Sequence, residues 1–196
     1  NPAAAAPGHN PEPKDQSDPP EFFLGSDKVT RHEAELKRGI ERPVQFYPMF
    51  EIALRHANGE RVSDHLKRIS ALWSRFNDAA VDNPNAWIRK NISAEDIRTP
   101  SPSNRPISYP YTKLMNSNNS VDQGAALILT SVGKARQLGI PESKWVYPYA
   151  GAEAWDHLYV SERDTLHTSP AIRFASTRLF DMAALTPGDM DHVDLY

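Results

Sequence analysis

The sequence predicts a chain of mixed α and β class, with more helix than strand and long irregular connections. Two segments between residues 43 and 80 carry apolar residues at helical spacing, and a shorter apolar run at residues 124–129 has the features of a buried strand. The 196 residues include 17 prolines against nine glycines, which favours irregular structure between these elements.

The first 42 residues are predicted to form an extended arm or linker. Asn1–Pro20 is rich in proline, alanine and charge, and it cannot bury enough apolar surface to offset the entropy of ordering it. Glu21–Leu24 is a short apolar patch that would pin this arm to a core. Arg31–Arg38 fits one or two helical turns with a charged face.

Two amphipathic helices are predicted next. The first spans Pro43–Asn58, with Pro48 in its first turn and Gly59 completing a left-handed cap. Ser63 is the expected N-cap of the second, which Asn83-Pro84 ends. We expect their apolar stripes to form core. The stripe residues are Tyr47, Phe50, Leu54 and Ala57 in the first helix, and Leu66, Ile69, Leu72, Trp73 and Phe76 in the second.

A polar segment followed by an apolar run lies at the centre of the chain. Asn116–Ser120 consists of Asn and Ser alone, and these side chains favour turns over helix. Gly124–Leu129 is small and apolar, as in a strand buried on both faces, and Gly124 leaves room for another backbone. A polar loop before a buried strand can face a ligand. The same loop also fits a turn whose side chains bond only their own backbone.

The C-terminal third is predicted to alternate short helices and strands. Val132–Leu138 fits a helix that Gly139 closes, and Trp145–Tyr147 fits a strand. A firm helix follows Ser169-Pro170, and Val193–Tyr196 starts another strand after a tight turn.

Composition excludes several classes of function. A net charge of −3 and a pI near 6.2 argue against a protein that holds a nucleic-acid backbone. The lack of cysteine excludes a thiolate metal site or a cysteine nucleophile within these residues. No apolar run is long enough to span a bilayer, and the start does not fit a signal peptide. We expect a cytoplasmic location. The absent initiator Met and the strand-like end predict a piece of a longer chain.

No metal site is predicted. His157, Glu162, Asp164 and His167 have a spacing that fits no ligand pattern, so a solvated loop is expected there. His56 and His65 lie near predicted helix ends, where we expect both to be partly exposed. The chain also lacks a glycine-rich phosphate loop.

The central stretch carries a family resemblance. Tyr111–Met115 leading into Asp122–Ala126 resembles the Asn/Ser-rich loop, Asp-Gly-Ala-Ala and following strand of the thiolase superfamily. It is most similar to thiolase-like acetyl-CoA acetyltransferases of the sterol-carrier type, although Gln123 separates the Asp from the Gly. The resemblance covers about Pro43–Tyr196. It implies the layered αβαβα thiolase fold in the parent, with a helical loop-domain-like region at 43–121 and the start of the C-terminal half at 122–196.

The resemblance also implies a function for the parent protein. This is an acyl-CoA acyltransferase of lipid or sterol side-chain metabolism, with a coenzyme A thioester as substrate and no permanently bound cofactor. Asn116, Ser117 and Asn118 would contact the coenzyme, while no catalytic residue lies within this chain. Two alternatives stay open: a thiolase-like aldolase with a small acyl-CoA-binding partner subunit, and a non-catalytic coenzyme A-binding module. The expected assembly is either a homo-oligomer or a complex with the small acyl-CoA-binding partner subunit.

Overall fold

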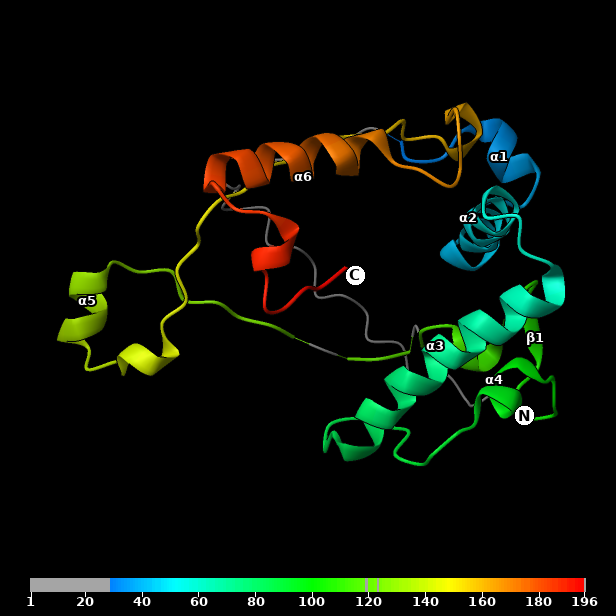
Figure 1. The fold of residues 1–196 in the computed structure, drawn as a ribbon, viewed down its shortest axis with the longest axis horizontal. Coiled ribbons are helices and arrows are strands. Elements are labelled where there is room, and N and C mark those ends of the chain that lie inside the picture. Colours follow the sequence, from blue (N-terminus) through cyan, green and yellow to red (C-terminus); the bar gives the residue numbers. More distant parts are fainter. Residues whose placement is uncertain (1–28, 119, 123, 196) are drawn as a thin grey trace, which may run out of the picture.

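A computed structural model describes residues 29–118, 120–122 and 124–195. The predicted arm up to residue 28, including its apolar patch at Glu21–Leu24, lies outside the described residues, as do Asn119, Gln123 and Tyr196. The described part is rich in helix and contains one small sheet, which confirms the predicted mixed class (Figure 1). Its helices and strands are α1 (Glu33–Lys37), α2 (Pro43–Ala57), α3 (Val62–Asp82), α4 (Ala94–Arg98), β1 (Pro106–Ser108), β2 (Tyr111–Thr112), α5 (Val132–Gln137) and α6 (Pro170–Ala183), with 3-10 turns η1 (Lys113–Met115), η2 (Glu142–Lys144), η3 (Val160–Glu162) and η4 (Pro187–Asp189).

Helix α2 begins and ends close to where the sequence predicts. Pro43 occupies its first position, and the side chain of Gln45 accepts a hydrogen bond of 2.6 Å from the backbone N–H of Arg42. Gly59 has a φ of +64°, which confirms the left-handed cap. Pro48 is buried inside the helix, so its predicted place in the first turn is wrong because the helix starts five residues earlier.

Helix α3 starts earlier than predicted. Its N-cap is Arg61, and the prediction that Ser63 caps it is wrong. Asp64 lies in the first turn with Oδ2 3.1 Å from Nε of Arg61, and a carboxylate there favours the helix dipole. The helix ends at Asp82, directly before the predicted stop at Asn83-Pro84.

The apolar core is small and lies between α3, α4 and the segment that follows β2. Its fully buried members are Ile69, Ile97 and Met115. Leu66 and Trp73 of the predicted α3 stripe pack against it, but Leu72 and Phe76 are exposed, the latter by 63%. The described residues thus bury only one part of the stripe that the helical spacing predicts.

Asn104 is a buried polar residue that joins α4 to the hairpin. Its amide nitrogen donates to the carbonyls of Asp96, Ile97 and Thr99 at 2.9–3.2 Å. Its amide oxygen accepts from the backbone N–H of Leu114 at 3.0 Å. The side chain therefore pairs carbonyls at the C-terminal end of α4, which have no partner within the helix.

The apolar run at Gly124–Leu129 does not form the predicted buried strand. Leu127, Ile128 and Leu129 are 84–92% exposed, and no atom lies within 4 Å of the position that a Cβ on Gly124 would take. A strand needs a neighbouring strand for its backbone groups. The described residues provide one two-stranded antiparallel sheet, β1 with β2, which this run does not join.

The other two predicted strands are also wrong within the described residues. Trp145–Tyr147 follows η2 as extended chain, and Trp145 instead donates its ring N–H to the carbonyl of Ile140 at 3.1 Å. Residues 193–195 have no regular secondary structure, and the two-stranded sheet of the described residues does not include them. Figure 1 shows α5 standing away from the other helices at the end of two extended segments. Its predicted bounds are confirmed to within one residue, and α6 starts at Pro170 with Ser169 as its N-cap, as predicted.

No helix in the described ranges is long and apolar enough to cross a membrane.

We expect Asn104→Ala to lower the free energy of unfolding by about 2 kcal/mol, because the carbonyls of Asp96 and Thr99 lose their amide donor and the Leu114 N–H loses its acceptor. Urea denaturation of the intact chain measures this. Asn91→Ala is the matched control at an exposed asparagine, for which a loss below about 0.5 kcal/mol is expected. Equal losses for the two variants would contradict the role assigned to Asn104.

Candidate functional site

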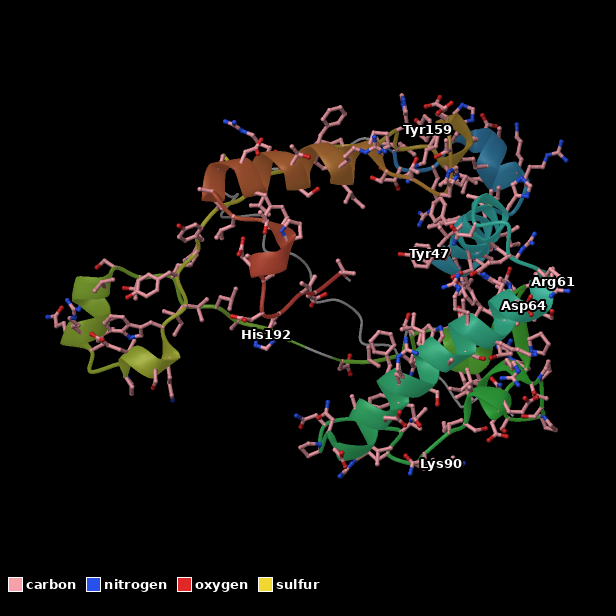
Figure 2. The ribbon with its side chains drawn as sticks, in the orientation of Figure 1. Tyr47, Arg61, Asp64, Lys90, Tyr159 and His192 are labelled. Atoms are coloured by element: carbon pink, nitrogen blue, oxygen red, sulfur yellow. The ribbon has the colours of Figure 1, made fainter. Side chains whose placement is uncertain are left out.

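The most developed concave surface of the described chain follows one face of α2. A pocket of about 660 Å³ and a smaller one of about 340 Å³ share Tyr47 and Phe50, so both are lined by the same part of α2. We call this surface the α2 groove. Tyr47 is 48% exposed, and Figure 2 shows its side chain extending away from α2. The apolar stripe that predicts a core contact for α2 therefore lines a groove.

The larger pocket lies between α1, α2, the segment of residues 152–163 and the first turns of α6. Its walls are mainly apolar, with a few charged groups among them. The guanidinium of Arg163 lies 5.5 Å from the centre of the Phe50 ring, within the range of a cation–π contact. The apolar and aromatic wall residues include Ile40, Phe46, Trp155, Leu158, Val160 and Ile172.

Glu35 ties the far wall of this pocket to α1. It is buried, and its two carboxylate oxygens accept hydrogen bonds from the backbone N–H groups of Ser161 at 2.8 Å and His32 at 2.9 Å. Burial acts to raise the pKa of Glu35, but the two backbone hydrogen bonds outweigh it and lower the pKa below 4.5. The carboxylate thus holds together segments that lie 126 residues apart in sequence.

Asp156 links the pocket wall to the start of α6. Its carboxylate accepts from the hydroxyl of Ser169 at 2.5 Å and from the backbone N–H of Ala171 at 3.1 Å. The hydrogen bond from Ser169 is the main reason that the pKa of Asp156 is lowered. The pocket wall and the N-terminus of α6 are therefore held as one unit.

The smaller pocket has a polar floor. The hydroxyl of Tyr111 on β2 donates to the carboxylate of Glu51 on α2 at 2.6 Å, and both residues line the pocket. Burial, followed by the neighbouring carboxylate, raises the pKa of Tyr111 well above its usual value. The hydroxyl therefore stays protonated and directed at Glu51.

Behind this floor lies His65, which is 1% exposed. Its Nδ1 is 2.6 Å from Oε2 of Glu60, and its Nε2 is 2.9 Å from Oε1 of Glu51, although the Nε2–H direction does not point at that oxygen. Arg68 pairs with the other oxygen of Glu60 at 2.7 Å. The hydrogen bonds from Arg68 and then His65 lower the pKa of Glu60. The prediction that His65 is partly exposed is wrong, because these partners allow its burial.

The predicted coenzyme-contacting residues do not line the α2 groove. Asn116 is half-buried and donates to the carbonyl of Thr112 at 2.8 Å, while Ser117 and Asn118 are exposed. The side chain of Asn118 accepts from the backbone N–H of Ser120 at 3.0 Å. None of the three lines either pocket. The hydrogen bond from Asn116 to Thr112 ties the start of this loop to β2, the strand that also carries Tyr111.

The predicted solvated loop is found as expected at His157, Glu162, Asp164 and His167, all of which are exposed. Over the described ranges, no group of three or more His, Asp or Glu side chains is arranged to hold a metal ion.

Sequence reasoning missed the charged floor of the groove. Glu51, Glu60 and Arg68 belong to different elements, and no local spacing links them to Tyr111. One signal was available: Tyr47, Phe50, Glu51 and Leu54 share one face of α2, so a carboxylate sits beside the apolar stripe.

Comparison with solved structures shows that the chain has a thiolase-like fold of the SCP2 type. No protein-family model and no curated protein matches the sequence. One matched structure is a monomeric SCP2-thiolase-like protein type 1 from Mycobacterium smegmatis, with 34% sequence identity and a TM-score of 0.71. The match covers 84% of this chain and 36% of that protein's chain, so the chain spans about a third of its length. The predicted resemblance is confirmed.

We expect Glu35→Gln to destabilise the chain by about 2 kcal/mol, because an amide loses the charge and presents N–H donors to backbone N–H groups. The lowered pKa of Glu35 means that its stabilising effect is present above about pH 4.5 and lost as the pH falls. The variant should therefore lose less stability than the original chain between about pH 6 and pH 3.5.

The matched control is Glu33→Gln, on the same helix. Glu33 pairs with Lys37 at the surface, and an exposed pair of this kind contributes less than about 0.5 kcal/mol. Urea denaturation at several pH values measures both variants. Parallel pH profiles for Glu35→Gln and the original chain would contradict the assignment.

Proposed function

We propose that this chain is part of a thiolase-type acyltransferase that acts on acyl-CoA thioesters in the cytoplasm, in lipid or sterol side-chain metabolism. The observation that carries the proposal is the 34% identity with an SCP2-thiolase-like protein over 84% of the chain. Identity at this level over most of the described fold supports a related ligand, and thiolase-type chemistry acts on coenzyme A thioesters.

The chain would contribute binding surface. Pantetheine carries amides and a hydroxyl, which short neutral side chains such as those of Asn116, Ser117 and Asn118 can pair. The α2 groove has mainly apolar walls with a few polar groups, the usual composition of a small-molecule site. We assign the loop to the pantetheine and the groove to the acyl part of the thioester.

The catalytic groups would come from other parts of the protein. Acyl transfer of this type needs a thiolate nucleophile, and these 196 residues contain no cysteine. The alternative is a thiolase-like aldolase, which needs no such nucleophile and would use a small acyl-CoA-binding partner subunit. A non-catalytic coenzyme A-binding module is the third candidate function.

Assays of the intact protein distinguish these functions. Acetyl-CoA formation from a 3-ketoacyl-CoA and free coenzyme A supports the acyltransferase. Cleavage of a 3-hydroxyacyl-CoA to an aldehyde or ketone, without consumption of free coenzyme A, supports the aldolase. Coenzyme A binding with neither activity supports the module, and the lack of both binding and activity would remove the proposal.

We expect Ser117→Ala and Asn118→Ala each to weaken coenzyme A binding to the intact protein about threefold to tenfold, the effect of losing one hydrogen bond. Isothermal titration calorimetry measures the affinities. Asn91→Ala, at an exposed asparagine outside the loop, should leave the affinity unchanged. Unchanged affinity in both loop variants would contradict the loop assignment, even where the protein still binds coenzyme A.

A further inference from the structure

The polar floor of the smaller pocket offers a ligand only hydrogen-bond acceptors. Tyr111 has a single hydroxyl hydrogen, and it donates this hydrogen to Oε2 of Glu51 at 2.6 Å. What remains of the phenol oxygen is its lone pairs. The carboxylate of Glu51 accepts hydrogen bonds and donates none. A ligand group that pairs with this floor therefore has to bring its own O–H or N–H hydrogen.

Glu51 retains the capacity to accept such a hydrogen. Among the described residues its Oε2 accepts from Tyr111, while its Oε1 accepts no hydrogen bond. Nε2 of His65 lies 2.9 Å from Oε1, but its N–H direction does not make a hydrogen bond to that oxygen. The side chain of Glu51 is 18% exposed and lines the pocket. Its free lone pairs can therefore be reached by a ligand.

The rest of the smaller pocket is mainly apolar. Apart from His167, which is exposed, the other lining residues are Tyr47, Phe50, Leu54 and Leu166. In surroundings of low polarity a hydrogen bond to a carboxylate is stronger than one between neutral groups. A carbonyl or ether oxygen has no hydrogen to give and would face other acceptors. A hydroxyl group on an apolar chain matches both the walls and the floor.

We propose that Glu51 selects an acyl thioester whose chain carries a hydroxyl group. The hydroxyl donates its hydrogen to the carboxylate, and the apolar part of the chain lies along the α2 groove. Tyr111 occupies the other oxygen of Glu51 and turns its only hydrogen away from the ligand, so the floor accepts a hydroxyl and disfavours a keto group. The inference rests on the proposed function, because it names the substrate class of the same groove.

The pantetheine arm of the coenzyme is the second source of a donor, through its amide N–H groups. The loop residues Asn116, Ser117 and Asn118 are assigned to that arm, and none of them lines the smaller pocket. Free coenzyme A carries the amides without an acyl chain, so it separates the two sources. Its affinity should be the same in Glu51→Gln and in the original protein, and a loss equal to that of the acyl ligand would contradict the proposal.

The first experiment compares ligands on the intact protein by isothermal titration calorimetry. The ligands are dodecanoyl-CoA, a series with one hydroxyl group at successive positions away from the thioester, and the matching keto series. We expect at least one hydroxylated ligand to bind about tenfold more tightly than dodecanoyl-CoA, the effect of one hydrogen bond to a charged group. Its keto counterpart should gain nothing. Equal affinities for the three kinds of ligand would remove the proposal.

Glu51→Gln tests the carboxylate itself. The amide has nearly the same size but presents N–H donors, which a keto oxygen can accept. The affinity ratio of the best hydroxylated ligand to its keto counterpart should therefore fall about threefold or more. Because this ratio compares two ligands in one variant, a general loosening of the pocket does not move it. An unchanged ratio would show that Glu51 does not read the hydroxyl.

The matched control is Glu33→Gln. Glu33 pairs with Lys37 on the surface of α1 and lines neither pocket. This variant makes the same exchange of carboxylate for amide outside the groove, and it should keep the affinity ratio of the original protein. The same fall in both variants would contradict the assignment to Glu51.

A second variant keeps the test decisive where Glu51→Gln does not fold. Tyr111→Phe removes the phenol hydroxyl and leaves the carboxylate with both oxygens for a ligand. We expect this variant to retain the preference for the hydroxylated ligand over its keto counterpart. Loss of the preference would show that Tyr111 and not Glu51 contacts the hydroxyl, and the proposal would fail.

The failure of the proposed function would look different. A protein that binds neither coenzyme A nor any of the dodecanoyl-CoA ligands removes that function. The pocket is then tested by ligand-observed NMR with the methyl esters of the same hydroxylated and keto dodecanoic acids. The best hydroxylated ester should bind about threefold or more tightly than its keto counterpart, and only in the protein that retains Glu51. Equal or absent binding of the two esters would overturn the inference as well.

Discussion

Polar side chains that leave water have to be paired, and in this chain that requirement joins segments that the small apolar core does not reach. Glu35 links α1 to the segment that precedes α6, and Asn104 links α4 to the turn after β2. Glu51 links α2 to both α3 and β2. Each of these side chains has hydrogen-bond or ion-pair partners in two elements. Each therefore fixes how those two elements lie against each other, which the small apolar core does not do alone.

The same requirement shapes the α2 groove. Its apolar walls combine the stripe of α2 with side chains of residues 152–163 and of α6, while its floor carries the carboxylate of Glu51 paired with Tyr111. A groove with apolar walls and a charged, hydrogen-bonded floor can bind an elongated apolar group and orient a polar one. This arrangement is the physical basis for assigning the acyl part of a thioester to it.

The sequence predicts the ends of helices well, because residues within one turn of the end set them. Pro43 and Gly59 set the ends of α2, and Ser169-Pro170 sets the start of α6, because caps act within one turn. The buried strand predicted at Gly124–Leu129 is absent, because a strand depends on partners elsewhere that periodicity does not reveal. The burial of His65 was missed for the same reason, since its partners come from separate elements.

Two exposed apolar surfaces of the described residues, Leu127–Leu129 and the α2 groove, differ in whether paired polar groups accompany them. This difference is the reason for assigning a ligand to the groove. Leu127–Leu129 is an apolar segment whose side chains are 84–92% exposed. The chain matches only 36% of the solved SCP2-thiolase-like protein, so ample thiolase-like fold lies beyond it in that protein to cover such a segment. A surface that packs against more protein needs no buried charge, because unpaired charge there would oppose the contact. The α2 groove instead has the hydrogen-bonded pair of Tyr111 and Glu51 at its floor, and paired polar groups of this kind in an otherwise apolar site are suited to orienting a polar group of a ligand.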